Sequence, residues 1–301
     1  MTWLVIGAAG QLGKSLTLAL TERDIKYASS NSSDLDITSK SMTLRYLSAI
    51  SPRVIINAAA WTDVDGAESH PKKARAVNAT GALNVALAAK EVGARLVHIS
   101  TDYVFSGNST SPWRSTDPHS PISVYGSSKA EGEVAVLSAY KEFSYIFRTA
   151  WLYSPWGKNF PKTIIKKVLQ DGELIKVVND QMGQPTSASD LADQIIDSVF
   201  AEIPVGIYHA ANSGYTTRFE FAKEILKLCH FPITRLSPIN STDFSQQASR
   251  PKYSVLNQDV WPAIGRGGVK VDVMRDWKVA LAEEMPAIIH EARRSNGQNG
   301  N

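Results

Sequence analysis

The sequence of 301 residues predicts an α/β fold in which a doubly wound parallel sheet is followed by a smaller C-terminal region. Three observations support this prediction. Short β-rich segments alternate with helix-length patterns through the first half of the chain. The first segment runs into a glycine-rich turn that opens a helix. The alternation then fades, and proline-bearing loops become frequent from Pro232 onward. We expect the sheet mainly in residues 1–150 and the smaller region mainly in residues 151–294, with some of its segments returning to the sheet.

The elements of the first half follow in order. A strand near Trp3 leads into a helix that begins near Gln11, and a second strand ends in the segment "YASSN". "RVIINAAA" (53–60) and "RLVHIS" (95–100) are strand-like. The segment between them has small residues at steps of three and four, which predicts one helix face: Ala74, Val77, Gly81, Val85, Ala88 and Val92. A helix from about Val124 and a strand over 143–153 complete this half.

The second half has less regular patterns. "NFPKTIIKKVLQ" and "ASDLADQIIDSVF" are helical in pattern, whereas "ELIKVV" and "GIYHAA" are strand-like. The tail, 295–301, is polar and rich in glycine and asparagine, so we expect it to be disordered.

Composition excludes several classes of protein. Hydrophobic residues make up 43% and charged residues 20% of the chain, as in ordinary globular proteins. The net charge of +3 is too small to indicate nucleic-acid binding. No apolar segment approaches the length of about 18 residues that spans a membrane, and we expect no signal peptide. Cys229 is the single cysteine, which suits the cytoplasm. It shows no metal-ligand spacing with His98 or His209, so we expect no metal.

The turn "GAAGQLGKS" contains two overlapping phosphate-binding patterns. Gly13-Lys14-Ser15 is the end of a P-loop, but Ala8 stands where a P-loop needs its first glycine. Gly7, Gly10 and Gly13 instead follow the spacing of a Rossmann-type dinucleotide turn. In such a turn the helix N-terminus binds a pyrophosphate. The spacing therefore favours a dinucleotide cofactor over a nucleoside triphosphate.

A second pattern indicates the chemistry. Tyr125 and Lys129 are four residues apart, and so lie on one helix face. Thr101 ends a predicted parallel strand at the edge where such sheets bind ligands. Reduction of a ketone needs a proton at oxygen as well as a hydride at carbon. We expect Tyr125 to donate the proton, Thr101 to hold the carbonyl oxygen, and Lys129 to lower the pKa of Tyr125 and to bind the nicotinamide ribose.

In its glycine turn and its Tyr125–Lys129 pair, the chain resembles the extended short-chain dehydrogenase/reductases and, among them, the dTDP-4-dehydrorhamnose reductases. The resemblance covers nearly the whole chain and includes "VIINAAAWTDVDGAE", "STDYVFSG", "RTAWLY", "VVNDQMGQPT" and "ASRPKYSVLN". It implies a catalytic trio of Thr101, Tyr125 and Lys129. It also implies that the remaining cofactor contacts are Gly7, Gly10, Gln11, Leu12, Gly13, Asp36, Ile37, Ala60, Trp61 and Thr62.

The same resemblance implies a substrate and its contacts. Asp102 and Trp151 would touch the deoxysugar, and Arg250 would contact its diphosphate through the guanidinium fork. The implied reaction is NAD(P)H-dependent reduction of the C4 ketone of dTDP-4-dehydro-6-deoxy-L-mannose to dTDP-L-rhamnose. The region 151–294 would then be the substrate-binding region, and 1–150 the NAD(P)-binding one.

Two departures from the family pattern change the expectations. Some members bind magnesium between subunits through glutamates, but Ser15 and Ser189 stand at the matching positions here. Since hard cations need charged oxygen ligands, we expect a monomer or a weak homodimer. The second strand also ends without the acid that binds the ribose 2′-OH of NAD. We therefore expect NADPH, with NADH possible.

Two other functions remain open on the sequence. One is a regulatory protein of the same fold, resembling the β subunit of methionine adenosyltransferase. Presence of Thr101, Tyr125 and Lys129 together argues against it. The other is an epimerase or dehydratase of the superfamily, since Asp102 beside the strand-end threonine occupies the place of an acid used in elimination.

Overall fold

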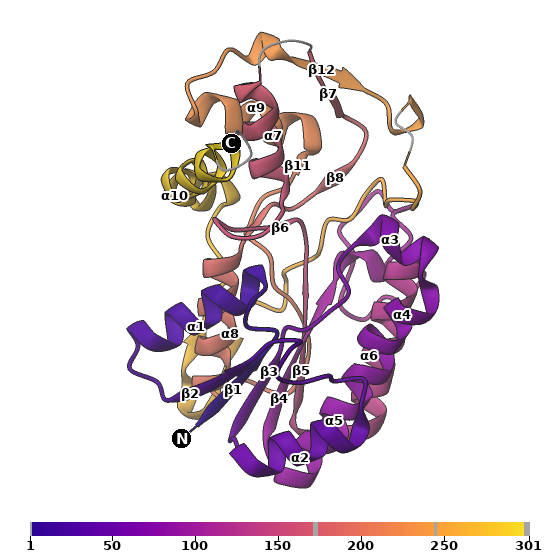
Figure 1. The fold of residues 1–301 in the computed structure, drawn as a ribbon, viewed down its shortest axis with the longest axis vertical. Coiled ribbons are helices and arrows are strands. Elements are labelled where there is room, and N and C mark those ends of the chain that lie inside the picture. Colours follow the sequence, from indigo (N-terminus) through magenta and orange to yellow (C-terminus); the bar gives the residue numbers. More distant parts are fainter. Residues whose placement is uncertain (1, 171–173, 244–245, 298–301) are drawn as a thin grey trace.

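The computed structural model describes residues 2–170, 174–243 and 246–297. Six parallel strands form the main sheet in the order β10-β5-β4-β3-β1-β2. Figure 1 labels β1 to β5 among them. Their bounds are β1 Trp3–Ile6, β2 Tyr27–Ser30, β3 Val54–Asn57, β4 Arg95–Thr101, β5 Ser144–Thr149 and β10 Gly206–His209. The strand order reverses at β1, which has β2 on one side and β3 on the other. Open α/β sheets bind ligands at such a switch point.

Helices cover both faces of this sheet, which confirms the doubly wound prediction. α1 (Gln11–Glu22) and α8 (Ala188–Phe200) lie on one face. α2 (Lys40–Ile50), α5 (Ala82–Val92) and α6 (Val124–Tyr140) lie on the other. Both faces are sealed by fully buried aliphatic side chains, each of which contributes about 1.5–3 kcal/mol. The sheet is thereby held rigid beneath the loops at its carboxyl edge.

The helix predicted between β3 and β4 is interrupted. α3 (Val64–Ser69) and α4 (Pro71–Arg75) lead into a π-helical turn over Ala76–Gly81, and α5 follows. Gly81 packs against Ile37, whose side chain would lie 2.7 Å from a Cβ at this position. The steps of three and four predict one uniform face, but a π turn adds a residue and shifts the face. Such a turn depends on tertiary contacts rather than on the pattern.

The strand predicted over 143–153 is two strands. β5 ends at Thr149, and β6 (Leu152–Tyr153) leaves the sheet to pair with β9 (Thr186–Ser187). Between them, Trp151 has a φ of +44°. The strand-like pattern of 143–153 gives no sign of such a break, because mainly apolar residues stand on both sides of it. The break carries the chain out of the sheet and into the smaller region.

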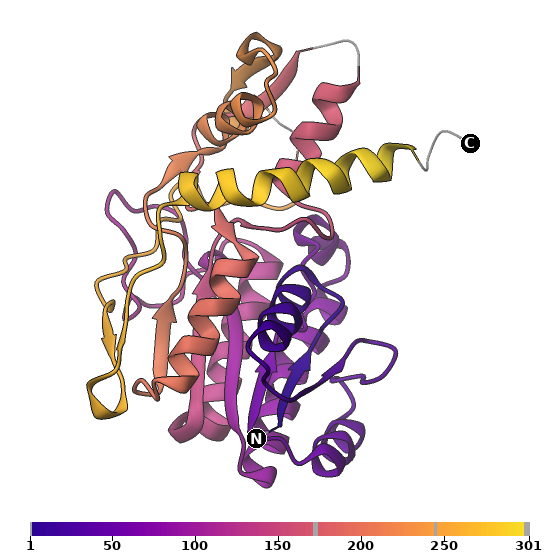
Figure 2. The same ribbon diagram turned by 90° about the vertical axis from the view of Figure 1, so that its left-hand side faces the viewer.

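The smaller region has its own core. α7 (Phe160–Leu169), α9 (Arg218–Leu228) and α10 (Trp277–Gly297) pack around the parallel pair β7 (Ile175–Val178) and β12 (Leu236–Ile239). A short antiparallel pair, β8 (Met182–Gly183) and β11 (Thr216–Thr217), adjoins them. Figure 2 shows α10 lying across the molecule between this region and the sheet.

Some segments of residues 151–294 return to the sheet. β10 is a strand of the sheet, and α8 packs on one face of it. The hairpin of β13 (Ala263–Ile264) and β14 (Lys270–Val271) packs on the same core as α8. Of the tail predicted to be disordered, 295–297 form the last residues of α10, and 298–301 lie outside the described residues. In the part of the chain that the structure describes, no helix is both long and apolar enough to cross a membrane.

Candidate active site

A cavity of about 790 Å³ lies at the carboxyl edge of the sheet, around the switch point. It extends from the turn after β1 to the first turn of α6 and to the start of α9. The predicted site residues that line it are Gly7, Gly10, Gln11, Leu12, Gly13, Asp36, Ile37, Ala60, Trp61, Thr62, Thr101, Asp102, Tyr125, Lys129 and Trp151. Arg250 is the predicted site residue that is not part of this lining. The fold thus brings together nearly all of the residues that the sequence singled out.

The three glycines of the first turn have different structural reasons. Gly7 has a φ of +83°, and a Cβ there would lie 2.7 Å from the backbone nitrogen of Ala59. A Cβ at Gly13 would lie 2.2 Å from the carbonyl oxygen of Gly7, so the turn and α1 touch directly. Gly10 has an ordinary φ of −74°, and a Cβ there would meet the same carbonyl oxygen at 3.3 Å. Gly10 therefore keeps the cavity open, whereas Gly7 and Gly13 are required by the fold.

The part of the cavity next to the end of β2 is polar, and no free carboxylate lies at the end of that strand. β2 ends at Ser30, and Asn31 and Ser32 line the wall that follows. Asp36 also lines the cavity, but its carboxylate accepts hydrogen bonds from the backbone nitrogen and hydroxyl of Thr38, at 2.9 and 2.7 Å. Asp36 therefore caps its own turn.

The loop after β3 is held by a residue that sequence reasoning missed. Asn78, buried in the π-helical turn, accepts from the backbone nitrogen of Trp61 at 2.8 Å and donates to its carbonyl oxygen at 3.1 Å. Its amide also donates to Ser128 on α6 at 2.9 Å. Asn78 thus fixes the loop of Ala60, Trp61 and Thr62 relative to α6. No local motif marks it, because its role depends on the π turn.

Thr101, Tyr125 and Lys129 converge at the centre of the cavity. Thr101 ends β4, and its hydroxyl is hydrogen-bonded to the phenol of Tyr125 and donates to Asp102 at 3.0 Å. Lys129 Nζ donates to the carbonyl oxygen of Ile99 at 2.6 Å. α6 packs directly against the turn after β4 at Gly126, where a Cβ would lie 2.2 Å from the carbonyl oxygen of Tyr103.

The electrostatic expectation for Tyr125 is wrong in direction. Burial raises the pKa of Tyr125 above its ordinary value, and the hydrogen bond with Thr101 offsets this in part. The sequence predicts that Lys129 lowers this pKa, but the Lys129 ammonium donates to the carbonyl oxygen of Ile99 and is not among the groups that shift it. Desolvation therefore dominates over the lysine charge, and Tyr125 is protonated at neutral pH.

Lys129 is the group whose pKa moves toward neutrality. Burial lowers its pKa to about 8, and the charge of Glu133, one turn further along α6, acts in the opposite direction. Glu133 is fully buried, bound to Arg148 at 2.7 Å and hydrogen-bonded to Ser100 and His119. These partners hold the pKa of Glu133 down to about 2. The buried carboxylate of Glu133 thus favours the charged form of Lys129, and no motif in the sequence indicates this interaction.

Trp151 and Arg218 lie together in the cavity wall, whereas Arg250 lies outside the lining. Arg218, missed by sequence reasoning, stacks on Trp151 with its Cζ 3.6 Å from the ring centroid. Arg250 instead forms a two-bond ion pair with Asp65, at 2.6 and 3.1 Å. This pairing lowers the pKa of Asp65 and directs Arg250 toward α3. A contact between Arg250 and a substrate stays a prediction.

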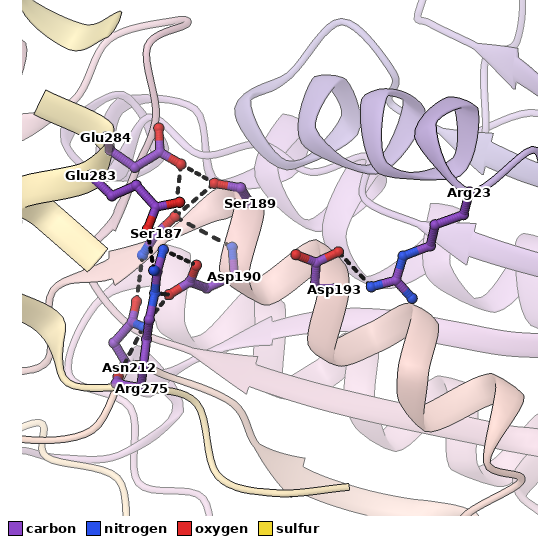
Figure 3. Close-up of polar contacts among 9 residues, drawn as sticks. All are labelled: Arg23, Ser187, Ser189, Asp190, Asp193, Asn212, Arg275, Glu283 and Glu284. Atoms are coloured by element: carbon purple, nitrogen blue, oxygen red, sulfur yellow. Dashed lines mark hydrogen bonds and ion pairs between the residues drawn. The ribbon is translucent and has the colours of Figure 1, made fainter. Parts of the chain in front are cut away.

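Of the two positions matched to magnesium ligands, Ser189 takes part in a network of hydrogen bonds, which Figure 3 shows. Ser189 and Ser187 both donate to Glu284 of α10, the latter at 3.1 Å. Nearby, Asp190 is paired with Arg275 at 2.8 Å. Ser15 is buried in α1. Among the described residues, no group of three His, Cys, Asp or Glu side chains is arranged to hold a metal ion.

A dinucleotide turn at the switch point, a strand-end threonine and a Tyr125–Lys129 pair on α6 define an oxidoreductase of the extended short-chain dehydrogenase/reductase type. The chain belongs to the family described as RmlD substrate binding domain, which matches residues 1–288.

Relatives within this family cover nearly the whole chain. A dTDP-4-dehydrorhamnose reductase from Streptomyces griseus is 41% identical over 296 residues, 97% of this chain and 95% of the relative. A probable dTDP-4,6-dihydroxy-2-methyloxan-3-one 4-ketoreductase from Streptomyces antibioticus is 38% identical, over 96% of both chains. The crystal structure of a dTDP-4-dehydrorhamnose reductase from Bacillus anthracis in complex with NADP has a TM-score of 0.87 at 36% identity, over 95% of this chain and 98% of the other.

Proposed function

We propose that this protein reduces the C4 ketone of dTDP-4-dehydrorhamnose to dTDP-L-rhamnose with NADPH. The observation that carries the proposal is the meeting of Thr101, Tyr125 and Lys129 in one cavity with the glycine turn. The similarity to reductases named for this substrate supports it. The relative named for a different dTDP-linked ketone supports the same ketone reduction on a dTDP-linked substrate.

The cavity residues fit a dinucleotide. Gly10 leaves open the space that a side chain would fill, and the first turn of α1 has no side-chain cap, which leaves its backbone N–H groups for a pyrophosphate. We propose that Ala60, Trp61 and Thr62 flank the cofactor along the loop after β3, with Asp36 and Ile37 at its adenine end. When bound, NADPH supplies the hydride that the substrate carbon receives.

The chain's own residues supply the proton and the alignment. Tyr125 donates its phenolic proton to the C4 oxygen, and burial keeps that proton in place at neutral pH. Thr101 directs the carbonyl oxygen toward Tyr125. Lys129 holds the nicotinamide ribose through its ammonium, and Asp102 and Trp151 contact the deoxysugar. We further propose that the protein is located in the cytoplasm. We also propose that it is a monomer or a weak homodimer, and light scattering of the purified protein would test this oligomeric state.

A coupled assay tests the proposed reaction. The nucleotide sugar is generated from dTDP-glucose by a dehydratase and an epimerase, and the absorbance of NADPH is followed after this protein is added. We expect NADPH to be consumed and dTDP-L-rhamnose to be formed. Absence of turnover with an intact, NADPH-binding protein would favour the regulatory alternative.

We expect NADPH to be used at least as well as NADH. β2 ends in Ser30, followed by Asn31, so the strand end offers hydrogen-bonding groups and no carboxylate to repel a 2′-phosphate. The test compares kcat/KM for the two cofactors. Asn31→Asp keeps the acceptor that binds Ser33 and adds a charge, so it should weaken NADPH more than NADH. A strong preference of the natural protein for NADH would contradict this prediction.

We also expect activity to fall as the pH rises through about 8. Lys129 loses its proton there, because burial lowers its pKa, whereas the pKa of Tyr125 is raised and its proton is retained. Since kcat/KM reports ionisations of the free enzyme, its alkaline limb should reflect Lys129. A direct titration of NADPH affinity against pH is the control. Constant affinity and activity well above this pH would show that the ammonium is not needed.

A further inference from the structure

Arg218 is a cation built into the cavity wall at the sugar end. It is the first residue of α9, and its guanidinium lies flat on the indole of Trp151, with Cζ 3.6 Å from the ring centroid. Trp151 is itself immobilised, because Gly183 packs so closely against the indole that a Cβ there would lie 2.5 Å from it. A stacked guanidinium uses its face for the ring and leaves its N–H edge for hydrogen bonds.

The charge of Arg218 has no carboxylate bound to it. None of the ion pairs within the described ranges includes Arg218, and its hydrogen-bond partner in the wall is the hydroxyl of Tyr103. Burial lowers its pKa to about 10, and the nearby charge of Arg250 lowers it further. Asp102 is near enough to interact electrostatically, but burial raises the pKa of Asp102 to about 6, so that carboxylate is poorly stabilised as an anion. A partly buried cation in this state favours an added anion.

The position of Arg218 identifies that anion. It lines the same cavity as Thr101 and Tyr125, and it interacts electrostatically with Asp102, the residue that follows Thr101. In a pyranose held with C4 at Tyr125, C1 is on the opposite side of the ring, and the phosphate bonded through C1 lies one ring width from the catalytic trio. Arg250, the arginine expected from sequence, is already neutralised by Asp65.

We propose that Arg218, stacked on Trp151, binds the sugar-linked β-phosphate of the nucleotide-sugar substrate. This inference rests on the function proposed above. The planar fork matches two phosphate oxygens at once, and the N-terminus of α9 adds favourable dipole interaction. The bound β-phosphate also neutralises the charge of the Arg218 guanidinium, which lies near Asp102. Arg218 is thus a substrate-binding residue that neither the dinucleotide motif nor the catalytic motif identifies.

Arg218→Gln tests the inference with thymidine diphosphate and thymidine monophosphate as probes. We expect Arg218→Gln to weaken the diphosphate roughly 10- to 100-fold, as for loss of hydrogen bonds to a charged group. The monophosphate, which lacks the β-phosphate, should change little. Calorimetry measures both, and NADPH affinity should stay within about threefold. Arg266→Gln is the matched control, since Arg266 is exposed and pairs with Glu202 away from the cavity.

The outcomes separate this inference from the proposed reaction. In the reductase assay, Arg218→Gln should raise KM for the nucleotide sugar far more than it lowers kcat, and Arg218→Lys should be intermediate. If the natural protein is an active reductase but Arg218→Gln binds thymidine diphosphate normally, Arg218 has no such role. Equal losses for both nucleotides, or lost NADPH binding, would point to collapse around Trp151 and also overturn it. If diphosphate binding depends on Arg218 in a protein without reductase activity, the proposed reaction alone fails. A natural protein that binds no thymidine diphosphate would refute both.

Discussion

Tyr125→Phe should lose roughly 10²- to 10⁴-fold in kcat, the usual contribution of a positioned general acid. The variant removes one oxygen, which is hydrogen-bonded to Thr101, and keeps the ring that packs edge-on against Tyr103 at 5.5 Å. The fold and the cofactor site should therefore survive, and NADPH affinity should be close to that of the natural protein. Single-turnover measurements with saturating NADPH would place the loss in the chemical step.

Lys129→Met is the comparison that separates the two roles. The lysine is assigned to the ribose, so its loss should reduce both NADPH affinity and rate. Near-normal turnover of Tyr125→Phe would mean that the proton comes from elsewhere, and the regulatory alternative would gain support. Asp102, which accepts from Thr101 at 3.0 Å, would then be the first residue to examine.

Gly10→Val should abolish detectable NADPH binding while leaving a cooperatively folded protein. The φ of −74° at Gly10 suits any residue, and the nearest atom to an added Cβ is the carbonyl oxygen of Gly7 at 3.3 Å. The branched side chain would therefore fill the space that we assign to the pyrophosphate. Isothermal calorimetry with NADPH and thermal unfolding measure the two expectations separately.

Gly13→Val is the contrasting variant. Its Cβ would lie 2.2 Å from the carbonyl oxygen of Gly7, so α1 has to move away from the turn. We expect a large drop in the melting temperature here and a small one for Gly10→Val. Unchanged NADPH affinity in a folded Gly10→Val protein would remove the pyrophosphate from this turn.

The sequence by itself predicted the sheet, its doubly wound character and most of the cavity lining. The signals are local: the glycine spacing depends on contacts within one turn, and the Tyr125–Lys129 pair depends on the period of one helix. "ASDLADQIIDSVF" is α8 to the residue, since its caps and its apolar face lie within the segment. The strand-end position of Thr101 likewise follows from one apolar run and its end.

Tertiary structure alone decided the features that depend on distant segments. Asn78 reaches Trp61 because a π turn rotates it inward. Glu133 of α6 is charged in the interior because Arg148, on strand β5, pairs with it. Arg218 lies on Trp151 although the two are 67 positions apart in the sequence, and Arg250 pairs with Asp65 across 185 positions. The direction of the Tyr125 pKa shift also belongs here, because desolvation depends on everything packed around the phenol, whereas the sequence shows a lysine one turn away and not the carbonyl that binds it.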